Sequence, residues 1–203
     1  MSDLPTIRIL RGHECRDDPC SALQDLAVQN YGSSSALPAS LLRSWYEENP
    51  SIFRIAVKSD NSVVGYISTL PLRLNVFNRT IDPDFQESII TAEDIDTSLC
   101  PSDGGVFLSS IAVAPEYQRQ SPASLLLRLA LIEDLIGECV EENQTVRISA
   151  QALSVKGEAC MRSLGMKARG FTTAGWRVYY GKLGKAALYS LQGELQRKIA
   201  IRF

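Results

Sequence analysis

The chain has 203 residues, of which 45% are hydrophobic and 22% are charged. A chain of this length and apolar content can bury a substantial core in one domain, so a disordered protein and a disulfide-stapled miniprotein are both excluded. The formal net charge of −2 and the pI near 5.5 lack the basic excess typical of nucleic-acid-binding domains, and we expect no nucleic-acid partner.

The N-terminus, the most apolar stretch and the cysteines indicate the cellular compartment of the protein. The N-terminus has neither a basic start nor an apolar run, and the most apolar stretch, Leu125–Leu131, is interrupted by Arg128, so no membrane association is predicted. Five cysteines without a C-x-x-C pair favour a reducing, cytoplasmic environment. His13 lies near Cys15 and Cys20, but their spacing matches no zinc pattern, and no metal site is predicted.

The first part of the chain predicts a strand, two helices and a hairpin. Proline and glycine mark the helix ends, and Asp60-Asn61 offers the turn of the hairpin. These elements are, in order, a strand over 6–10, a helix from Pro19 to Gly32, a helix after Pro38 that stops before Pro50, and strands over 53–57 and 63–70.

An acidic stretch follows, between residues 72 and 105. It contains no Lys or Arg from Ile81 to Asp103. Such a run is typical of a solvated face. Its acidic residues are Asp82, Asp84, Glu87, Glu93, Asp94, Asp96 and Asp103.

Residues 107–136 predict a strand, a loop and a helix. The side chains of 107–113 alternate as in a buried strand, and Pro115 ends it. Ser121 then takes an N-cap position, and Pro122 takes the first helical position. A strand that leads into a helix in this way brings free N–H groups and the positive end of the helix dipole to one point, which suits a phosphate.

The same segment resembles the signature of the GNAT superfamily of acyl-CoA-dependent N-acyltransferases, V-x-P-x-Y followed by Q/R-x-x-G-x-G/A. Here the signature reads Val113-Ala114-Pro115-Glu116-Tyr117 and then Gln118-Arg119-Gln120-Ser121-Pro122-Ala123. Ser121 replaces the first glycine, which adds a side chain, and Pro122 removes one N–H donor. The element order and the run Val64-Gly65-Tyr66-Ile67 also resemble this family.

The resemblance implies an α/β (α+β mixed) GNAT fold, in which a central, mixed, twisted sheet is flanked by helices and splayed where two strands part. It implies acetyl-CoA as co-substrate and no metal. The backbone of Ile111, Ala112 and Val113 would hold the pantetheine arm and polarise the thioester carbonyl. The other cofactor-binding residues that it implies are Gln118, Arg119, Gln120, Ser121, Pro122, Ala123, Ser124 and Ser154.

Residues 145–150 predict a further strand, and 154–164 predict a short helix. The run Ser154–Met166 resembles the family's N-x-x-A-x-x-x-Y-x-x-x-G-F, with Met161 at the tyrosine position. In the family that tyrosine commonly protonates the departing thiolate, which a thioether cannot do. The catalytic candidates are therefore Tyr179 or Tyr180 and Cys160 as replacement acids, and Ser110, with Ser109, to position a water.

The end of the chain predicts a hairpin, 167–171 with 176–180, and a basic amphipathic helix whose leucines recur at helical spacing. We therefore divide the chain into a GNAT domain, 1–184, and a C-terminal helix, 185–203. This helix packs on the domain or forms a homodimer contact.

These observations predict an N-acetyltransferase that transfers the acetyl group of acetyl-CoA to a primary amine of a small molecule or protein by direct attack. In the family the connection between the third and fourth strands borders the acceptor site, so acidic residues such as Asp94 and Asp96 would attract a cationic acceptor. Candidates are a polyamine-like molecule and a lysine or N-terminal amine of a protein. Because Met161 replaces the tyrosine, the alternative is a weak or inactive GNAT-fold module that binds acyl-CoA. A third reading is acyl transfer to an acceptor other than an amine.

Overall fold

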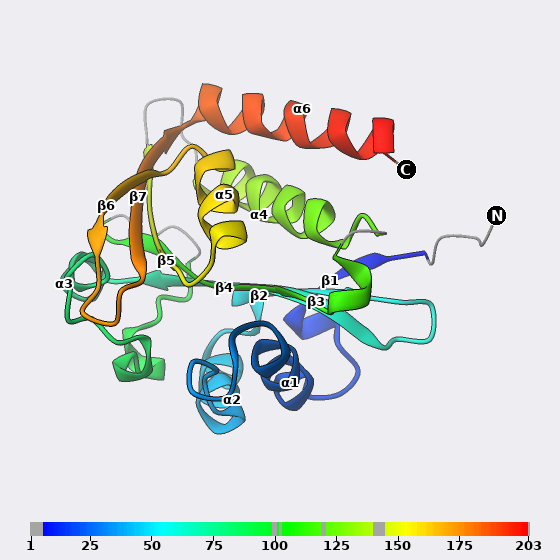
Figure 1. The fold of residues 1–203 in the computed structure, drawn as a ribbon, viewed down its shortest axis with the longest axis horizontal. Helices are drawn as coiled ribbons and strands as arrows, with labels where there is room; N and C mark the ends of the chain where they lie inside the picture. Colours follow the sequence, from blue (N-terminus) through cyan, green and yellow to red (C-terminus); the bar gives the residue numbers. More distant parts are fainter. Residues whose placement is uncertain (1–5, 99–100, 102, 119–120, 140–144, 203) are drawn as a thin grey trace.

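The computed structural model describes residues 6–98, 101, 103–118, 121–139 and 145–202. Within them a seven-stranded mixed sheet has the order β1-β2-β3-β4-β5-β7-β6 and carries helices on both faces (Figure 1). The strands are β1 (Arg8–Arg11), β2 (Phe53–Val57), β3 (Val63–Leu72), β4 (Gly105–Val113), β5 (Thr145–Ala152), β6 (Lys167–Phe171) and β7 (Arg177–Gly184). The helices are α1 (Cys20–Tyr31), α2 (Ala39–Glu48), α3 (Leu74–Arg79), α4 (Ala123–Cys139), α5 (Val155–Ser163) and α6 (Lys185–Arg202). No helix in these ranges is long and apolar enough to cross a lipid bilayer.

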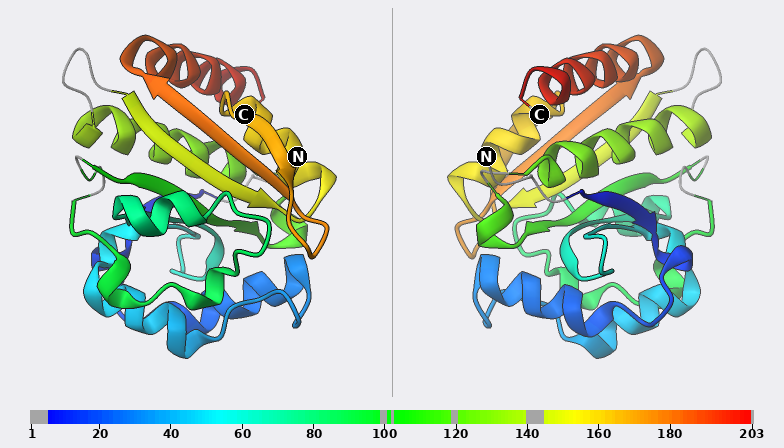
Figure 2. Two further views of the ribbon diagram at one scale, coloured as in Figure 1. Left: turned by 90° about the vertical axis from the view of Figure 1, so that its left-hand side faces the viewer. Right: turned by 90° about the vertical axis from the view of Figure 1, so that its right-hand side faces the viewer.

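The helices form two layers. Helices α1, α2 and α3 cover one face of the sheet, and α4, α5 and α6 cover the other (Figures 1 and 2). In the first layer Trp45 is fully buried, and its indole N–H donates to the carbonyl of Ile90 at 3.1 Å. Because Ile90 lies in the connection between β3 and β4, this bond ties that connection to α2.

A buried ion pair fixes α4 to the sheet. Arg54 of β2 contacts Asp134 of α4 at 2.5 Å, and Arg11 of β1 contacts the other oxygen of that carboxylate at 3.2 Å. Arg54 and Asp134 are both buried. A buried charge without a partner is costly. A shift of α4 along β1 and β2 would separate the Asp134 carboxylate from its arginines, so the ion pair holds α4 in place.

Strands β4 and β5 are parallel and pair only over Val106–Leu108 and Ile148–Ala150. Beyond these residues the two strands part, while β4 stays paired with β3 up to Val113. The β3–β4 register shifts by one residue, which makes Ser109 the extra residue of a β-bulge in β4. Side-chain alternation therefore changes phase, so that Ser109 and Ser110 both face the layer of α1 and α2.

The structure confirms the mixed α/β class and nearly all the predicted elements. The last strand is longer than predicted and reaches Gly184. Helix α3 and the short 3-10 turns Glu87–Ile89 and Ala92–Asp94 were not predicted. One or two turns are too short to show a hydrophobic period, and such helices depend on tertiary packing.

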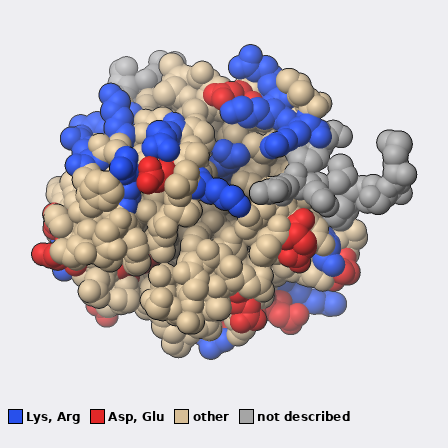
Figure 3. Space-filling view, in the orientation of Figure 1, with Lys and Arg blue, Asp and Glu red and all other residues tan. Residues whose placement is uncertain are grey.

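The C-terminal helix α6 packs against α4. Leu188 and Leu195 are buried in the core that α4 shares with the sheet. Lys and Arg side chains gather along the top of Figure 3, where α6 lies in Figure 1. The helix thus buries its apolar stripe on its own domain, and a homodimer contact stays a prediction.

Candidate active site

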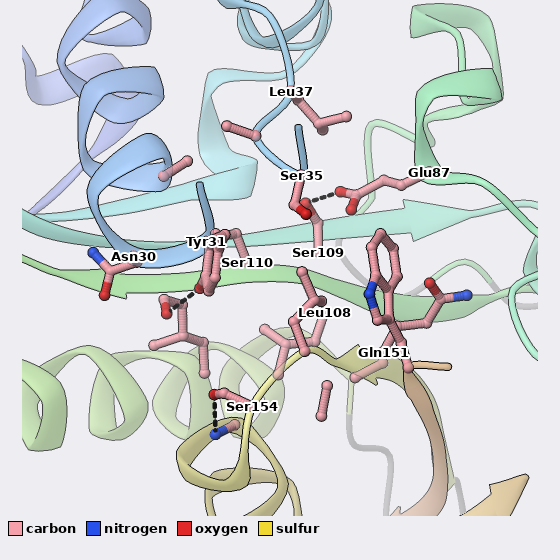
Figure 4. Close-up of a pocket in the computed structure, with 18 of the residues that line it drawn as sticks. Asn30, Tyr31, Ser35, Leu37, Glu87, Leu108, Ser109, Ser110, Gln151 and Ser154 are labelled. Carbon is pink, nitrogen blue, oxygen red and sulfur yellow. Dashed lines mark hydrogen bonds between the residues drawn. The ribbon is translucent and has the colours of Figure 1, made fainter. Parts of the chain in front are cut away.

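A cavity of about 610 Å³ opens where β4 and β5 part (Figure 4). Its walls come from the end of α1 and the loop after it, from β4, from the start of α5, from residues 85–88, and from the turn between β6 and β7. Figure 4 shows Tyr31 and Glu87 on opposite sides of Ser110 and Ser109, with Ser154 below the strand. One continuous space therefore joins both sides of β4.

One end of the cavity meets the N-termini of two helices. Ser124 in the first turn of α4 lines it, as do Ser154 and Gly157 of α5. Ser154 caps α5 by accepting a hydrogen bond from the N–H of Gly157 at 3.1 Å. Lys156 adds a cation at this end and donates to Gln118 at 2.9 Å. Two helix N-termini and a lysine form a favourable environment for a phosphate group.

Two carbonyls of β4 point into the gap between the strands. The carbonyl of Ile111 accepts from the Tyr31 hydroxyl at 2.5 Å. The carbonyl of Val113 accepts from Gln118 at 3.0 Å and from Asn30 at 3.2 Å. Side chains therefore satisfy backbone groups that a neighbouring strand would satisfy in a closed sheet.

The predicted residues on β4 and after it lie at different places. Ile111, Val113, Gln118 and Ser124 line the cavity, whereas the Ala112 side chain is buried in the α1 and α2 layer. Pro122 accepts the first helical hydrogen bond of α4, from Leu126, and Ala123 is fully buried. Neither of these two residues lines the cavity. Arg119 and Gln120 lie outside the described residues.

Ser121, which replaces a glycine of the signature, points inward. It is buried, donates to the carbonyl of Tyr117 at 2.8 Å and accepts from the N–H of Ala123 at 3.3 Å. Its side chain is therefore used to shape the turn before α4 and is not among the groups that line the cavity. The Ser121 side chain, which stands where the signature has glycine, therefore does not narrow the cavity.

Tyr31 brings a phenol to the middle of the cavity. Besides donating to Ile111, its hydroxyl accepts from Ser110 at 3.4 Å. Burial raises the pKa of Tyr31, so the phenol keeps its proton at neutral pH. No motif in the sequence marks Tyr31, which has the spacing of an apolar residue on the inner face of α1.

Glu87 brings a carboxylate to the same cavity from the other side. Ser109 donates a hydrogen bond to it, and Ser68 donates to Ser109 at 3.0 Å. Burial raises the pKa of Glu87 to about 7, and the hydrogen bond from Ser109 acts in the opposite direction. A carboxylate with this pKa exchanges protons near neutral pH, which suits a general base.

The predicted catalytic residues differ in position. Ser110 and Cys160 line the cavity, together with Met161 at the family's tyrosine position. Burial raises the pKa of the Cys160 thiol, so it is protonated at neutral pH. Tyr179 lies elsewhere, because its hydroxyl donates to Glu158 at 3.1 Å and accepts from Arg162 at 3.1 Å, outside the cavity lining. This placement argues against a role for Tyr179 in the chemistry.

The acidic stretch contributes one carboxylate to the cavity, that of Glu87. Asp94 accepts from the backbone and hydroxyl of Thr91, and Asp96 accepts from the N–H of Ser98. Both carboxylates shape their own segment and are absent from the lining. The Thr-x-x-Asp capping pattern accounts for Asp94. Flanking apolar residues do not single out Glu87, since Ile90 and Ile95 flank Asp94 as well.

Comparison with known proteins gives one family. The model of the acetyltransferase (GNAT) family matches residues 20–142, more than half of the chain. No curated protein matches the sequence at a significant level.

Solved structures share the fold at low sequence identity. The loading GNATL domain of CurA from Lyngbya majuscula is 11% identical with a TM-score of 0.63, over 87% of this chain and 98% of that one. Naa20 from Chaetomium thermophilum, solved with a bisubstrate analogue, is 15% identical with a TM-score of 0.53, over 91% and 89%. The N-acetyltransferase YhbS from Escherichia coli, solved with CoA, is 14% identical with a TM-score of 0.53, over 91% and 84%.

Proposed function

Since this chain belongs to the acetyltransferase (GNAT) family, we propose that it transfers the acetyl group of acetyl-CoA to a primary amine by direct attack. One observation carries the proposal: a single cavity joins two helix N-termini to a half-buried carboxylate across a splayed strand. The end of the cavity at the two helix N-termini suits a phosphate-bearing thioester, and the end at the Glu87 carboxylate suits an amine. We also propose that the protein works in the cytoplasm, in line with its cysteine usage.

The residues present fit acetyl-CoA. The N-termini of α4 and α5, with Lys156, favour its phosphates. The carbonyls of Ile111 and Val113 accept hydrogen bonds from side chains, and these bonds can be exchanged for bonds from the amides of a pantetheine arm. Bound acetyl-CoA supplies an activated acyl carbon.

Glu87 is the proposed base. An ammonium has no lone pair, so the acceptor must lose a proton before or during its attack on the thioester carbon. The Glu87 carboxylate takes the ammonium proton first, which frees the lone pair for attack. The C–N bond then forms, the C–S bond breaks, and the second proton that the nitrogen loses balances the one that the departing thiolate takes up. Ser109 holds the carboxylate in place through its hydrogen bond, and Ser68 holds Ser109.

Tyr31 is the proposed acid for the sulfur that leaves. Its hydroxyl lies beside Ile111, where the resemblance places the thioester, and donates to the carbonyl of that residue. The Tyr66 phenol also lines the cavity, but it contacts Ser110. Tyr31 would thereby supply the proton for which Met161 has no group. Ser110 orients the phenol by donating to it.

Relatives of this fold support an amine acceptor without identifying it. One is a glucosamine N-acetyltransferase region of a fungal enzyme, with a TM-score of 0.52 and 12% identity, and another is the NatC complex bound to a Gag peptide and CoA, at 0.54 and 13%. Proteins with similar folds thus act on acceptors of quite different size. The acceptor of this chain has to be argued from its own cavity.

The test is turnover of acetyl-CoA with a panel of primary amines. Release of free CoA is followed with a thiol reagent, and the amide is identified by mass spectrometry. Amide formation that depends on both substrates supports the proposal. Saturable binding of acetyl-CoA without amide, across the panel, would instead favour the binding-module alternative, and CoA release without amide would indicate a different acceptor.

A further inference from the structure

The acceptor end of the cavity has few charges. Among all the described residues that line the cavity, the charged ones are Glu87 and Lys156. Lys156 belongs to the opposite end, where it donates to Gln118 at 2.9 Å. One carboxylate is therefore available for one ammonium, and a second ammonium in this space would lose its hydration without a counter-charge.

The rest of the acceptor end carries no charge among its described residues, and large apolar side chains lie there beside neutral polar ones such as Ser35, Gln86 and Thr172. This end is formed by the loop after α1, by residues 85–88 and by the turn before β7. Phe85 is buried and held edge-on against Phe107, with ring centroids 5.6 Å apart. The large apolar and aromatic residues of this end are Leu37, Leu42, Tyr66, Phe85, Leu108 and Trp176.

Two acidic residues further along the same connection add no charge to the cavity. The Asp94 and Asp96 carboxylates are engaged with Thr91 and Ser98 and lie outside the cavity lining. The neutral character also extends to the outer surface. In Figure 3 most of the middle of the face, between α5 and the layer of α1 and α2, carries no charged side chains.

We infer that the acceptor is a monoamine whose amino group is attached to an apolar chain or ring. Its ammonium meets Glu87, its apolar part contacts the walls at Leu37 and Trp176, and polyamines are poor acceptors because their second ammonium has no partner. The inference rests on the proposed function and narrows it to a substrate class. A free apolar amine and a polypeptide with a large apolar N-terminal residue share this chemistry.

The test compares two acceptors that differ in one charge. Hexylamine and hexamethylenediamine have the same chain, and the second carries an additional ammonium at the far end. At saturating acetyl-CoA we expect kcat/KM to be at least about tenfold higher for hexylamine. Phenethylamine and a short neutral peptide with N-terminal leucine distinguish the two sources, and spermidine is the polyamine reference.

A charge variant makes the test specific to this cavity. Leu37→Glu places a second carboxylate in the wall and should lower the preference for hexylamine over the diamine by about tenfold. Leu74→Glu is the control, because Leu74 is 40% exposed and does not line the cavity. The preference of this variant for hexylamine over the diamine should equal that of the unmodified protein.

Three different results would each contradict a different claim: the monoamine class, the position of the acceptor end, or acetyl transfer itself. Equal or better turnover of hexamethylenediamine or spermidine would refute the monoamine inference and leave acetyl transfer intact. An unchanged preference in Leu37→Glu would refute the assignment of this end to the acceptor. No amide from any amine or peptide, with acetyl-CoA still bound, would refute the proposed function and the inference with it.

Discussion

Glu87 combines burial with a position at the middle of the cavity. Ser109 donates to its carboxylate, and burial raises its pKa to about 7. A base acts when it is deprotonated, so kcat/KM should rise with pH and level off above a midpoint near 7. We expect Glu87→Gln to lower kcat/KM by a factor on the order of 10² to 10⁴ and to remove this midpoint.

The pH profile of acetyl transfer, measured for both proteins with the same amine, checks this prediction. Glu116→Gln serves as a control, because Glu116 lies in the turn after β4 and is absent from the lining. If Glu87→Gln retains the full rate and the same profile, another group is the base.

The same carboxyl should also affect folding stability. Its pKa is about 7 in the folded protein and about 4.3 in an unfolded chain. Between these values the folded state holds a proton that the unfolded state has released, so stability decreases as pH rises toward 7. The cost above pH 8 is at most roughly 4 kcal/mol, because the side chain is partly exposed. Urea unfolding should therefore show Glu87→Gln gaining stability over the parent protein from pH 5 to pH 8, and a pH-independent difference would contradict the burial argument.

Tyr31 is the residue whose proposed role was least visible in the sequence. We expect Tyr31→Phe to lower kcat by about tenfold to a hundredfold with a smaller change in KM for the amine, because the ring stays and the proton donor is lost. Steady-state kinetics measures both parameters. An acyl donor with a more acidic leaving thiol should reduce the defect, since it needs less protonation, and an equal defect with both donors would limit Tyr31 to packing.

Among the secondary-structure elements, β4 shows best what a pattern can and cannot predict. Alternation over 107–113 predicted the strand, and Pro115 predicted its end. The bulge at Ser109 was not predictable, because it arises from the register against β3, which no local pattern specifies. That bulge turns both Ser109 and Ser110 toward the cavity, so the two hydroxyls that orient Glu87 and Tyr31 depend on a tertiary feature.

Helix α4 depends on the buried ion pair that holds it to β2. Asp134 meets Arg54 at 2.5 Å and Arg11 at 3.2 Å, with the side chains of Asp134 and Arg54 only 8% and 6% exposed. We expect Asp134→Ala to cost roughly 3 to 5 kcal/mol of unfolding free energy, since Arg54 is left without its carboxylate.

Chemical denaturation measures this cost. The control is Glu194→Gln, which breaks the exposed pair of Glu194 with Lys198 in α6 and should leave the free energy of unfolding nearly unchanged. Equal losses in the two variants would contradict the importance assigned to burial.

For the whole molecule, the sequence analysis predicted the class, the strand and helix order of most of the fold, and a ligand site at the helix that follows β4. Those predictions depend on local signals such as Pro115 and the apolar period of α4. Glu87, Tyr31 and the cavity depend on segments more than twenty residues apart in the chain meeting at β4. The acidic stretch also showed that composition alone cannot distinguish a carboxylate that caps its own turn from one that faces a cavity.

The claim that acetyl-CoA binds where β4 and β5 part has one direct test, titration calorimetry with acetyl-CoA. Ser124→Glu places a carboxylate in the first turn of α4, which favours the helix but repels a phosphate at its N-terminus. Ser190→Glu adds the same charge to the exposed side of α6. We predict saturable binding to the parent protein and to Ser190→Glu, and at least about tenfold weaker binding to Ser124→Glu. Equal binding to all three proteins, or binding to none, would contradict the site.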